Sequence, residues 1–546
     1  MAASESPAEG GKTSSGPPSQ PRGQPQTQTQ AQPQTQPHAG LSLVDPDGVE
    51  VEHGDDTDDI VPGAGFHTLP VVGLGGSAGS IVALGHFFDC TPAHTGQAYV
   101  VVLHLAPAHH STLPELLQRH STMPVRTATD AVKLEADTVY VIPPGKHLTT
   151  TDGHLRLTDL QPEHGKRVAV DLFFRSLADT HGPHATAIVL SGADGDGAMG
   201  LKRIKERGGL TIAQDPSEAE HASMPKSAIA TGMVDWVLRV AQMPQRIAAY
   251  RSRERRLQLP PEDGPHPTPV ESAAAERELR LREILDFLRA RTGRDFSYYK
   301  RATIVRRISR RMQVGGVEEL ADYMGVLRTQ PGEAAALVGE LLISVTNFFR
   351  DRESFDALEP HLAERFEGKD ADSTLRVWVP ACATGEEAYS MAMLLLEHAR
   401  QLEGPPTLQV FACDLDDDAI RFARAGLYPD TITADVSEER LRRFFTKVPS
   451  GYLVKREVRE MVLFATHDLL KDAPFSRIDL LSCRNLLIYL NREAQARCFE
   501  IFNFAINPGG VLFLGSSETV PEGSPLFTPL DKKHRLYRQQ IGRAHV

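Results

Sequence analysis

A serine, a histidine and an aspartate, which together can hydrolyse an ester, each stand at the end of an apolar run in the first half of this 546-residue chain. Ser77 follows LPVVGL, His104 lies in AYVVVLHL, and Asp196 comes shortly after TAIVL. Such runs predict buried strands, and the carboxyl ends of parallel strands meet at one edge of a sheet. There the three side chains could act as nucleophile, general base and orienting acid.

The glycine-rich turn around Ser77 is open to two other interpretations. Residues 75–79, GGSAG, fit the G-x-S-x-G turn that presents a nucleophilic serine. Residues 73–78, GLGGSA, also fit the G-x-G-x-x-A dinucleotide fingerprint, and a tight turn without chemistry is a third possibility. A dinucleotide site needs an acid at the end of the second strand, where this chain has His104, so the serine interpretation is favoured.

Four blocks in this part of the chain carry a family resemblance. VVGLGGSAGSIVAL, VVLHLAPAHHSTLPELL, VDLFFRSLA and VLSGADGDGAMGLKRIKERGG resemble, in this order, the catalytic domain of the chemotaxis protein-glutamate methylesterases (the CheB family). The resemblance covers roughly residues 68–249 and implies that Ser77, His104 and Asp196 are the catalytic triad of a serine hydrolase. The family usually has a second glycine where this chain has Ser80.

A second candidate site lies in the other half of the chain. A predicted strand ends in ACATGEEAYS, a turn of small residues that opens a helix, and the next predicted strand ends at Asp414. Small residues let a ligand lie against the backbone, and the aspartate could hold ribose hydroxyls. Because no GxGxxG is present, a nucleoside ligand without phosphates fits better than a dinucleotide. A capped helix followed by a surface aspartate is the alternative.

This half also carries a family resemblance. The blocks LLISVTNFFRDRESF, VWVPACATGEEAYSMA, VFACDLDDDAIRFARAGLY, LLSCRNLLIYL and NPGGVLFLGSSE, within residues 276–538, resemble the chemotaxis protein-glutamate O-methyltransferases (the CheR family). The resemblance implies S-adenosylmethionine as cofactor, with contacts from Ser344, Thr346, Arg350, Glu386, Glu387, Asp414, Asp468, Leu469, Asn485, Leu486 and Tyr489.

Within that set, the resemblance puts Arg350 and Tyr489 beside the transferring methyl group. Ser344 and Asp468 stand where the family commonly has asparagine, which alters two polar contacts to the cofactor. The long stretch at 426–461 implies an insertion that forms a small β-subdomain and meets receptors.

The fold class expected is α/β, with two doubly wound sheet domains, the second a methyltransferase fold preceded by a small helical subdomain. The domains expected are a disordered Gln/Pro-rich and acidic tail at 1–67, a methylesterase domain at 68–250, a linker at 251–274, a helical subdomain at 275–345 and a methyltransferase domain at 346–546. The predicted strands are residues 69–74, 98–105, 139–142, 187–190, 210–213, 375–381, 408–413, 462–466, 478–483 and 510–515.

One predicted helix, residues 299–312 (YKRATIVRRISRRM), carries six basic residues and no acid. It is either a packed helix with a solvated basic face or a helix that docks on an acidic partner, and its charge alone does not decide between them.

Composition limits the other function classes. The five cysteines form no CxxC pair, which favours neither a metal site nor a disulfide framework. No apolar run approaches the ~20 residues of a membrane helix, and the N-terminal residues lack a basic-then-apolar signal, so we expect a cytoplasmic protein without membrane insertion. The formal net charge of -12 argues against nucleic-acid binding.

The two resemblances imply opposed reactions on one chain: methylation of glutamate side chains with S-adenosylmethionine, and hydrolysis of the resulting esters. The implied partner is a methyl-accepting receptor or another signalling protein that carries acceptor glutamates. The stretch before Thr68 is too short and too polar for a phosphorylatable receiver domain, and the abrupt end after Tyr537 is compatible with a longer natural protein. The alternative is a receptor-binding signalling scaffold in which one or both domains are catalytically weak.

Overall fold

The computed structural model describes residues 67–104, 112–159, 168–254, 256–257, 259 and 272–540. Apart from residue 67, the tail that we expect to be disordered lies outside these described residues, and so does most of the expected linker. Among the helices of the described residues, none has the length and apolar character needed to span a membrane.

The first domain is built on seven parallel strands in the order β10–β9–β8–β1–β2–β5–β3. They are β1 (Val71–Gly76), β2 (Ala98–Leu103), β3 (Val125–Thr127), β5 (Thr138–Val141), β8 (Ala185–Val189), β9 (Leu210–Gln214) and β10 (Trp236–Leu238). A small antiparallel sheet of β4 (Val132–Lys133), β7 (His154–Asp159) and β6 (Lys146–Thr151) flanks it.

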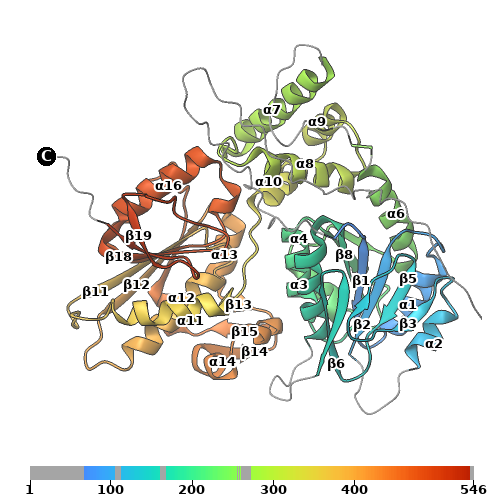
Figure 1. The fold of residues 1–546 in the computed structure, drawn as a ribbon, viewed down its shortest axis with the longest axis horizontal. Helices are drawn as coiled ribbons and strands as arrows, with labels where there is room; N and C mark the ends of the chain where they lie inside the picture. The colour runs from blue at the N-terminus through green and yellow to red at the C-terminus, as the bar shows by residue number, and fades with distance from the viewer. Residues whose placement is uncertain are drawn as a thin grey trace, which may run out of the picture. The chain divides into compact units, whose positions relative to one another are not determined.

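Helices cover both faces of this sheet, which explains the uninterrupted apolar runs of its strands. On one face, Val71 packs in a core with Phe173 of α3, and α4 and α5 complete that layer. On the other face, Val72 packs in a core with Phe87 of α1, and α2 and α6 complete the layer. The helices are α1 (Ser80–Asp89), α2 (Leu113–Gln118), α3 (Ala169–His181), α4 (Ala198–Glu206), α5 (Ser223–Ala230) and α6 (Met243–Glu254), as Figure 1 shows.

The second sheet is mixed, with the order β16–β12–β11–β17–β18–β20–β19. Its first five strands are parallel, and β20 and β19 pair antiparallel at the far edge. Its elements are β11 (Thr374–Pro380), β12 (Thr407–Asp414), β16 (Val462–Thr466), β17 (Ile478–Cys483), β18 (Ile506–Leu514), β19 (Phe527–Asp531), β20 (Leu536–Gln539), and the helices α11 (Arg352–Ala363), α12 (Glu386–Ala399), α13 (Asp417–Ala425) and α16 (Arg492–Ala505).

The long stretch between β12 and β16 forms a small subdomain. Three short strands, β13 (Leu427–Tyr428), β15 (Gly451–Val454) and β14 (Phe445–Val448), make an antiparallel sheet beside α14 (Glu438–Phe444) and α15 (Arg456–Met461). The insertion therefore carries strands, as the resemblance implied.

Four helices form a separate core ahead of the second sheet: α7 (Ser272–Thr292), α8 (Arg301–Gly315), α9 (Leu320–Thr329) and α10 (Glu333–Leu342). The predicted apolar stripe of Ile304, Val305, Ile308 and Met312 lies in this core on α8. The expected α/β class, with a parallel-sheet domain followed by a helical region and a second, mixed sheet, is confirmed.

The basic face of α8 is docked and not solvated. Arg307 donates to the carbonyl oxygens of Lys205 (3.2 Å) and Glu206 (2.5 Å), and Arg310 donates to that of Gly209 (2.6 Å). These carbonyls lie at the carboxyl end of α4, where helical C=O groups lack partners and the helix dipole is negative. Of the two interpretations of this basic helix, docking is the one observed, and the partner lies within the same chain.

A cluster of four buried charges supports this contact. Lys205 forms ion pairs with Asp235 (2.6 Å) and Glu340 (2.8 Å), and Arg310 pairs with the same two carboxylates, at 2.8 Å to Glu340. Burial opposes ionisation of Glu340, but Arg310, Lys205 and Arg307 outweigh it and lower the pKa of Glu340 to about 2. Both carboxylates are therefore ionised, and each depends on both cations.

Replacing Arg310 by methionine should destabilise the full chain by roughly 3–5 kcal/mol, because two buried carboxylates lose a partner. Urea unfolding of the full chain measures this effect. Arg328→Met, which changes an exposed arginine on the neighbouring helix α9, is the matched control and should shift the transition little. Equal stability of the two variants would contradict the importance assigned to the cluster.

Candidate active sites

The predicted triad residues lie together at one edge of the first sheet. Ser77 follows β1, His104 follows β2, and Asp196 follows β8, which are three neighbouring strands. His104 Nδ1 is 3.3 Å from Ser77 Oγ, and His104 Nε2 is 2.7 Å from Asp196 Oδ2. One ring nitrogen therefore faces the hydroxyl while the other is held by the carboxylate, as in a serine hydrolase triad, although Nδ1 and Nε2 have exchanged their usual places.

Asp196 is fixed by the helix that packs beside it. Its carboxylate accepts hydrogen bonds from the amides of Val170 and Asp171, both at 2.9 Å, at the start of α3. The amide of Gly197 donates to it as well, at 2.9 Å. These three amides fix the direction of the Asp196 side chain toward His104.

The glycines of the Ser77 turn have different roles. A Cβ at Gly75 would lie 2.2 Å from Val170 Cγ1, so α3 can approach only a glycine. Gly79 has φ +75°, a left-handed conformation that other residues adopt at a cost. Ser77 itself does not have a positive φ, so the left-handed residue of this turn lies two positions after the serine.

A second carboxylate near His104 was not anticipated from the sequence. Asp194 Oδ2 lies 3.3 Å from His104 Nδ1, the nitrogen that faces Ser77. Burial lowers the pKa of His104, but the hydrogen bonds and charges of Asp194 and Asp196 outweigh it and raise that pKa to about 9. The signal in the sequence for Asp194 was the GADGDG turn, because both of its acids follow β8.

The second site lies at the carboxyl ends of β11, β12 and β17. A narrow cavity of about 40 Å³ opens there, and eight of the predicted cofactor residues line it: Ser344, Thr346, Arg350, Glu387, Asp414, Asn485, Leu486 and Tyr489. They come from four separate stretches of the chain, and the sheet brings them together.

Asp414 organises the turn that faces this cavity. Its Oδ2 accepts a hydrogen bond from the amide of Ala383 (2.8 Å), and its Oδ1 accepts one from the amide of Asp416 (2.9 Å). Burial raises the pKa of Asp414. Ala381 and Ala383 have positive φ values of 54° and 47°, so the small-residue turn is strained as well as open.

Three predicted contacts lie away from the cavity. Glu386 accepts a hydrogen bond from Thr384 Oγ1 (2.6 Å) and points toward Lys202 of the first domain, at 3.9 Å. Asp468 accepts one from the amide of Leu470 (3.0 Å), and Leu469 is buried in the core that contains Trp378. The structure does not bring Glu386, Asp468 or Leu469 to the cavity wall.

Two buried charges that sequence reasoning missed hold the site in shape. Arg484 lines the cavity and pairs with Asp351 (2.8 Å) and Glu387 (3.5 Å). Glu518 accepts hydrogen bonds from the amides of Asn485 (3.0 Å) and Leu487 (2.7 Å), which fixes the loop after β17. Arg484 stands in the quoted block LLSCRNLLIYL and Glu518 in the quoted block NPGGVLFLGSSE. These blocks were the signal in the sequence from which the two residues could have been found.

The donor and acceptor set of this cavity fits a nucleoside cofactor. Asp414 supplies a half-buried carboxylate. The Oδ1 of Asn485 is buried without a hydrogen-bond partner among the described residues, so it can accept a hydrogen bond from a ligand. A volume of about 40 Å³ is smaller than a nucleoside, so side chains must move for one to enter. The segment that carries Ser344, Thr346 and Arg350 includes three left-handed residues, Ile343, Phe349 and Asp351, and is the strained element at this wall.

Comparison with known families identifies both halves. The family described as CheB methylesterase matches residues 72–247. The CheR methyltransferase all-alpha domain matches residues 280–342, and the CheR methyltransferase SAM binding domain matches residues 344–536. The cofactor of the second domain is therefore S-adenosylmethionine.

Individual relatives agree with these matches. The chain is 39% identical over 439 residues to an "Uncharacterized 104.1 kDa protein in hypE 3'region" of Rhodobacter capsulatus, covering 78% of this chain and 46% of that protein. The chain thus spans less than half the length of this relative. It is 30% identical to a chemotaxis protein methyltransferase of Listeria monocytogenes, covering 42% of this chain and 85% of that protein.

Among solved structures, the CheB methylesterase catalytic domain of Thermotoga maritima is 27% identical, with a TM-score of 0.32, and the match covers 33% of this chain and 98% of that one. From the family matches and the Listeria relative, the chain belongs to the chemotaxis protein methyltransferase (CheR) family and carries a CheB methylesterase domain ahead of its methyltransferase domain.

Proposed function

We propose that this chain is a bifunctional signalling enzyme that methylates glutamate side chains of a receptor protein and hydrolyses the resulting methyl esters. The observation that carries the proposal is the presence on one chain of a Ser77–His104–Asp196 triad in hydrogen-bonding geometry and of a CheR-type S-adenosylmethionine-binding domain. The division into tail, methylesterase domain, linker, helical subdomain and methyltransferase domain, with the bounds given above, is part of this proposal.

In the esterase reaction, Ser77 Oγ attacks the ester carbonyl while His104 Nδ1 takes its proton. Asp196 holds the other ring nitrogen and stabilises the imidazolium. His104 then protonates the leaving methoxide, which departs as methanol. In the second half of the reaction His104 takes a proton from water, the resulting hydroxide attacks the carbonyl of the serine ester, and His104 returns the proton to Ser77 Oγ as the glutamate leaves.

The oxyanion of this reaction needs backbone donors near Ser77. The amides of Ser77 and Gly192 are engaged with the carbonyls of Ser191 (3.0 Å) and His221 (2.9 Å), respectively. The candidates are therefore the amides that follow Ser77 in its turn, beginning with Ala78.

In the transferase reaction, S-adenosylmethionine supplies the methyl group as an electrophile when it is bound. Asp414 and Asn485 are the residues that would hold its ribose and polar atoms, and Arg350 and Tyr489 line the cavity wall beside them. The acceptor glutamate has an ordinary pKa of about 4.3 and is ionised at neutral pH, so the transfer needs alignment and no general base.

The scaffold alternative is not favoured. Its esterase half would need a defective triad, and Ser77, His104 and Asp196 are all present in bonding geometry. In the transferase half, Ser344 lines the cavity and donates to Asp416 Oδ2 at 3.2 Å, so its departure from the common asparagine keeps a polar contact at that wall.

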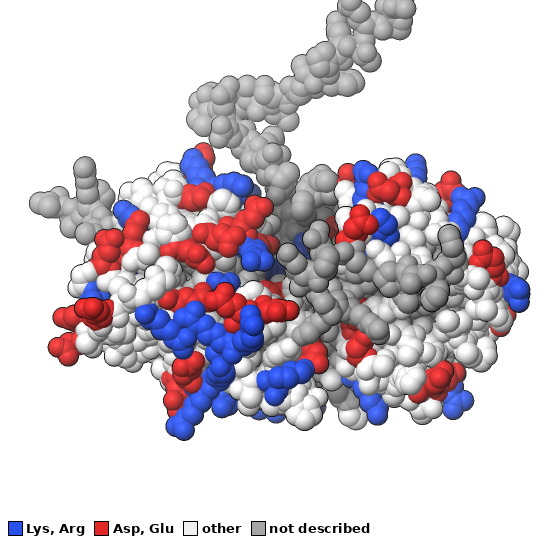
Figure 2. Space-filling view, turned by 90° about the horizontal axis from the view of Figure 1, so that it is seen from below, with Lys and Arg blue, Asp and Glu red and all other residues white. Residues whose placement is uncertain are grey.

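For the partner, we propose a methyl-accepting receptor that meets the inserted β-subdomain, with no role for nucleic acid. The face of the molecule seen in Figure 2 carries lysine and arginine side chains gathered together, and the subdomain itself has the exposed side chains of Arg442, Lys447 and Arg456. Basic side chains attract a segment rich in acceptor glutamates. All five cysteines are free, which fits the reducing cytoplasm that we propose as the location.

Ser77→Ala should lower ester hydrolysis by roughly 10⁴-fold or more, because the nucleophile is lost, and should leave methyl transfer unchanged. The assay is release of radiolabelled methanol from a receptor fragment that carries methylated glutamates. Ser217→Ala, which removes an exposed hydroxyl bonded to Asp215, is the control and should hydrolyse normally. Near-normal hydrolysis by Ser77→Ala would contradict the triad.

Asp414→Ala should weaken binding of S-adenosylhomocysteine by about tenfold to several hundredfold, since charge-assisted hydrogen bonds contribute roughly 1.5–3 kcal/mol each. Calorimetric titration of the full chain measures the loss. Asp418→Ala, which removes an exposed acid four positions later, is the matched control and should bind as the unmutated chain does. Equal affinities of the two variants would place the ribose elsewhere.

Ester hydrolysis should depend on pH through His104. The imidazole must be neutral to take the serine proton, and a pKa of about 9 means that kcat/KM rises about tenfold per pH unit below pH 9 and levels off above it. Asp194→Asn removes one carboxylate that favours the imidazolium, so the rise should shift to lower pH. Identical pH profiles for both chains would exclude Asp194 as a cause of the shift.

A further inference from the structure

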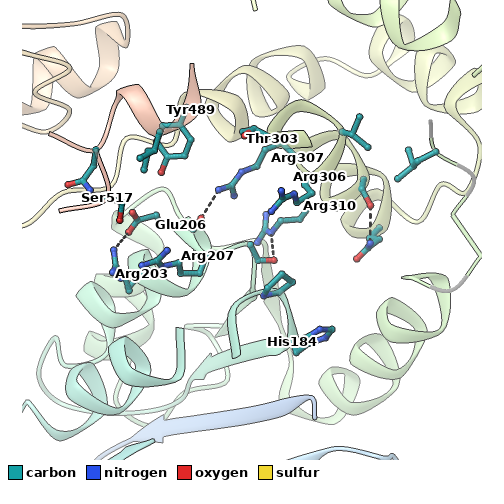
Figure 3. A pocket seen from close by; sticks show the side chains of 18 of the residues that line it. His184, Arg203, Glu206, Arg207, Thr303, Arg306, Arg307, Arg310, Tyr489 and Ser517 are labelled. Carbon is teal, nitrogen blue, oxygen red and sulfur yellow. Dashed lines mark hydrogen bonds and ion pairs between the residues drawn. The ribbon is translucent and has the colours of Figure 1, made fainter. Parts of the chain in front are cut away.

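A cavity of about 430 Å³ lies between the carboxyl end of α4 and the methyltransferase residues (Figure 3). Arg203, Glu206 and Arg207 line it from the esterase side, and Arg350 and Tyr489 line it from the other. In Figure 3, Glu206 and Tyr489 border the same space. A carboxylate of one catalytic domain is thus placed at the active site of the other.

This cavity meets the cofactor cavity at a shared wall. Arg350, Asn485 and Tyr489 line both spaces, while Asp414 and Glu387 line only the cofactor side. These three residues therefore stand where a methyl group held on the cofactor side and an acceptor in the larger cavity would meet. The acceptor carboxylate must therefore approach the shared wall from the larger cavity.

Glu206 is the carboxylate found there. Its Oε1 is 2.8 Å from Arg350 Nη2, and its Oε2 is 2.7 Å from Arg203 Nη1. Burial opposes its ionisation, but Arg350 and Arg203 outweigh burial and lower the pKa of Glu206 to about 2. Burial and the charge of Glu206 raise the pKa of Tyr489 to about 12, so that hydroxyl remains a donor.

We propose that the Arg350 face of this cavity is the acceptor-carboxylate site of the methyltransferase, and that Glu206 occupies it as an internal ligand. The proposal rests on the proposed function, because the acceptor in that reaction is a glutamate side chain. The chemical class of the ligand is an ionised carboxylate presented from a helix, as Glu206 is presented from the last position of α4.

Arg350 has one guanidinium edge for a carboxylate, and Glu206 occupies it. Its Nη1 donates to the carbonyl of Val345 (3.1 Å) within the methyltransferase, and its Nη2 is the edge that holds Glu206. Arg307 fixes the backbone of the internal ligand by donating to the Glu206 carbonyl (2.5 Å). An external glutamate therefore competes with Glu206 for one guanidinium edge, and the methyltransferase accepts a receptor only when α4 withdraws.

The same contact brings the methyltransferase insertion to the esterase site. Asp435 forms a bidentate pair with Arg175 of α3, at 2.7 and 3.1 Å. Thr431 lies beside the loop that carries Asp194, since a Cβ at Gly195 would be 3.7 Å from Thr431 Cγ2. Withdrawal of α4 from Arg350 would thus also move the insertion from the esterase site, so that one contact governs both opposed reactions.

The test compares S-adenosylmethionine with S-adenosylhomocysteine as calorimetric probes of the full chain. Only S-adenosylmethionine carries a sulfonium charge, so a carboxylate at the acceptor position favours it. Glu206→Gln should lower the preference for S-adenosylmethionine by roughly three- to tenfold. A purely structural ion pair between the domains would weaken both probes alike or neither.

Two further variants complete the test. Glu206→Asp keeps the negative charge but moves it away from Arg350, and should give an intermediate preference for S-adenosylmethionine. Glu220→Gln removes an exposed acid of the esterase domain that pairs with His221, and should leave that preference unchanged. Urea unfolding of each variant reports that the chain is folded. An unchanged preference in folded Glu206→Gln and Glu206→Asp overturns the proposal, whereas failure of the unmutated chain to bind either probe contradicts the cofactor site itself.

Discussion

The buried cluster of Lys205, Arg310, Asp235 and Glu340 is the constraint on which the arrangement of this protein depends. Each carboxylate accepts from both cations, so none of the four charges can leave without stranding a partner in the interior. Such a cluster contributes little net stability compared with apolar packing, because all four groups lose their hydration. The cluster does fix how the two helices align, because its ion pairs form only when α8 lies against the end of α4 in one position.

Helix α4 is the element that this register positions. It begins at Ala198, two residues after the triad aspartate Asp196, and ends at Glu206 on Arg350. A shift of α4 is therefore felt at both ends, at the esterase through the loop that carries Asp196 and at the methyltransferase through Glu206. Opposed reactions on one chain consume cofactor without effect unless something prevents them from running together, and a shared helix provides a physical coupling between the sites.

The two sites handle charge in opposite ways. The esterase surrounds His104 with the carboxylates of Asp194 and Asp196, which favour the imidazolium and so hold back the base at neutral pH. The methyltransferase surrounds its shared wall with cations and buried donors, which favour an ionised carboxylate such as Glu206. The substrate that we propose for one site is a neutral ester and that for the other an anion, and these environments match that difference.

The sequence by itself determined the two sheets, because their strands are covered by helices on both faces and so read as unbroken apolar runs. It located Ser77, His104, Asp196 and Asp414, because residues at the carboxyl ends of parallel strands converge whatever the loops do. It missed short strands such as β3 and β10, which carry too few residues for a pattern. Only the tertiary structure decided that Glu386, Asp468 and Leu469 lie off the cavity, that Asp194 faces His104, and that the basic α8 docks on α4. Those outcomes depend on side-chain direction and on contacts between segments a hundred residues apart, which no local pattern encodes.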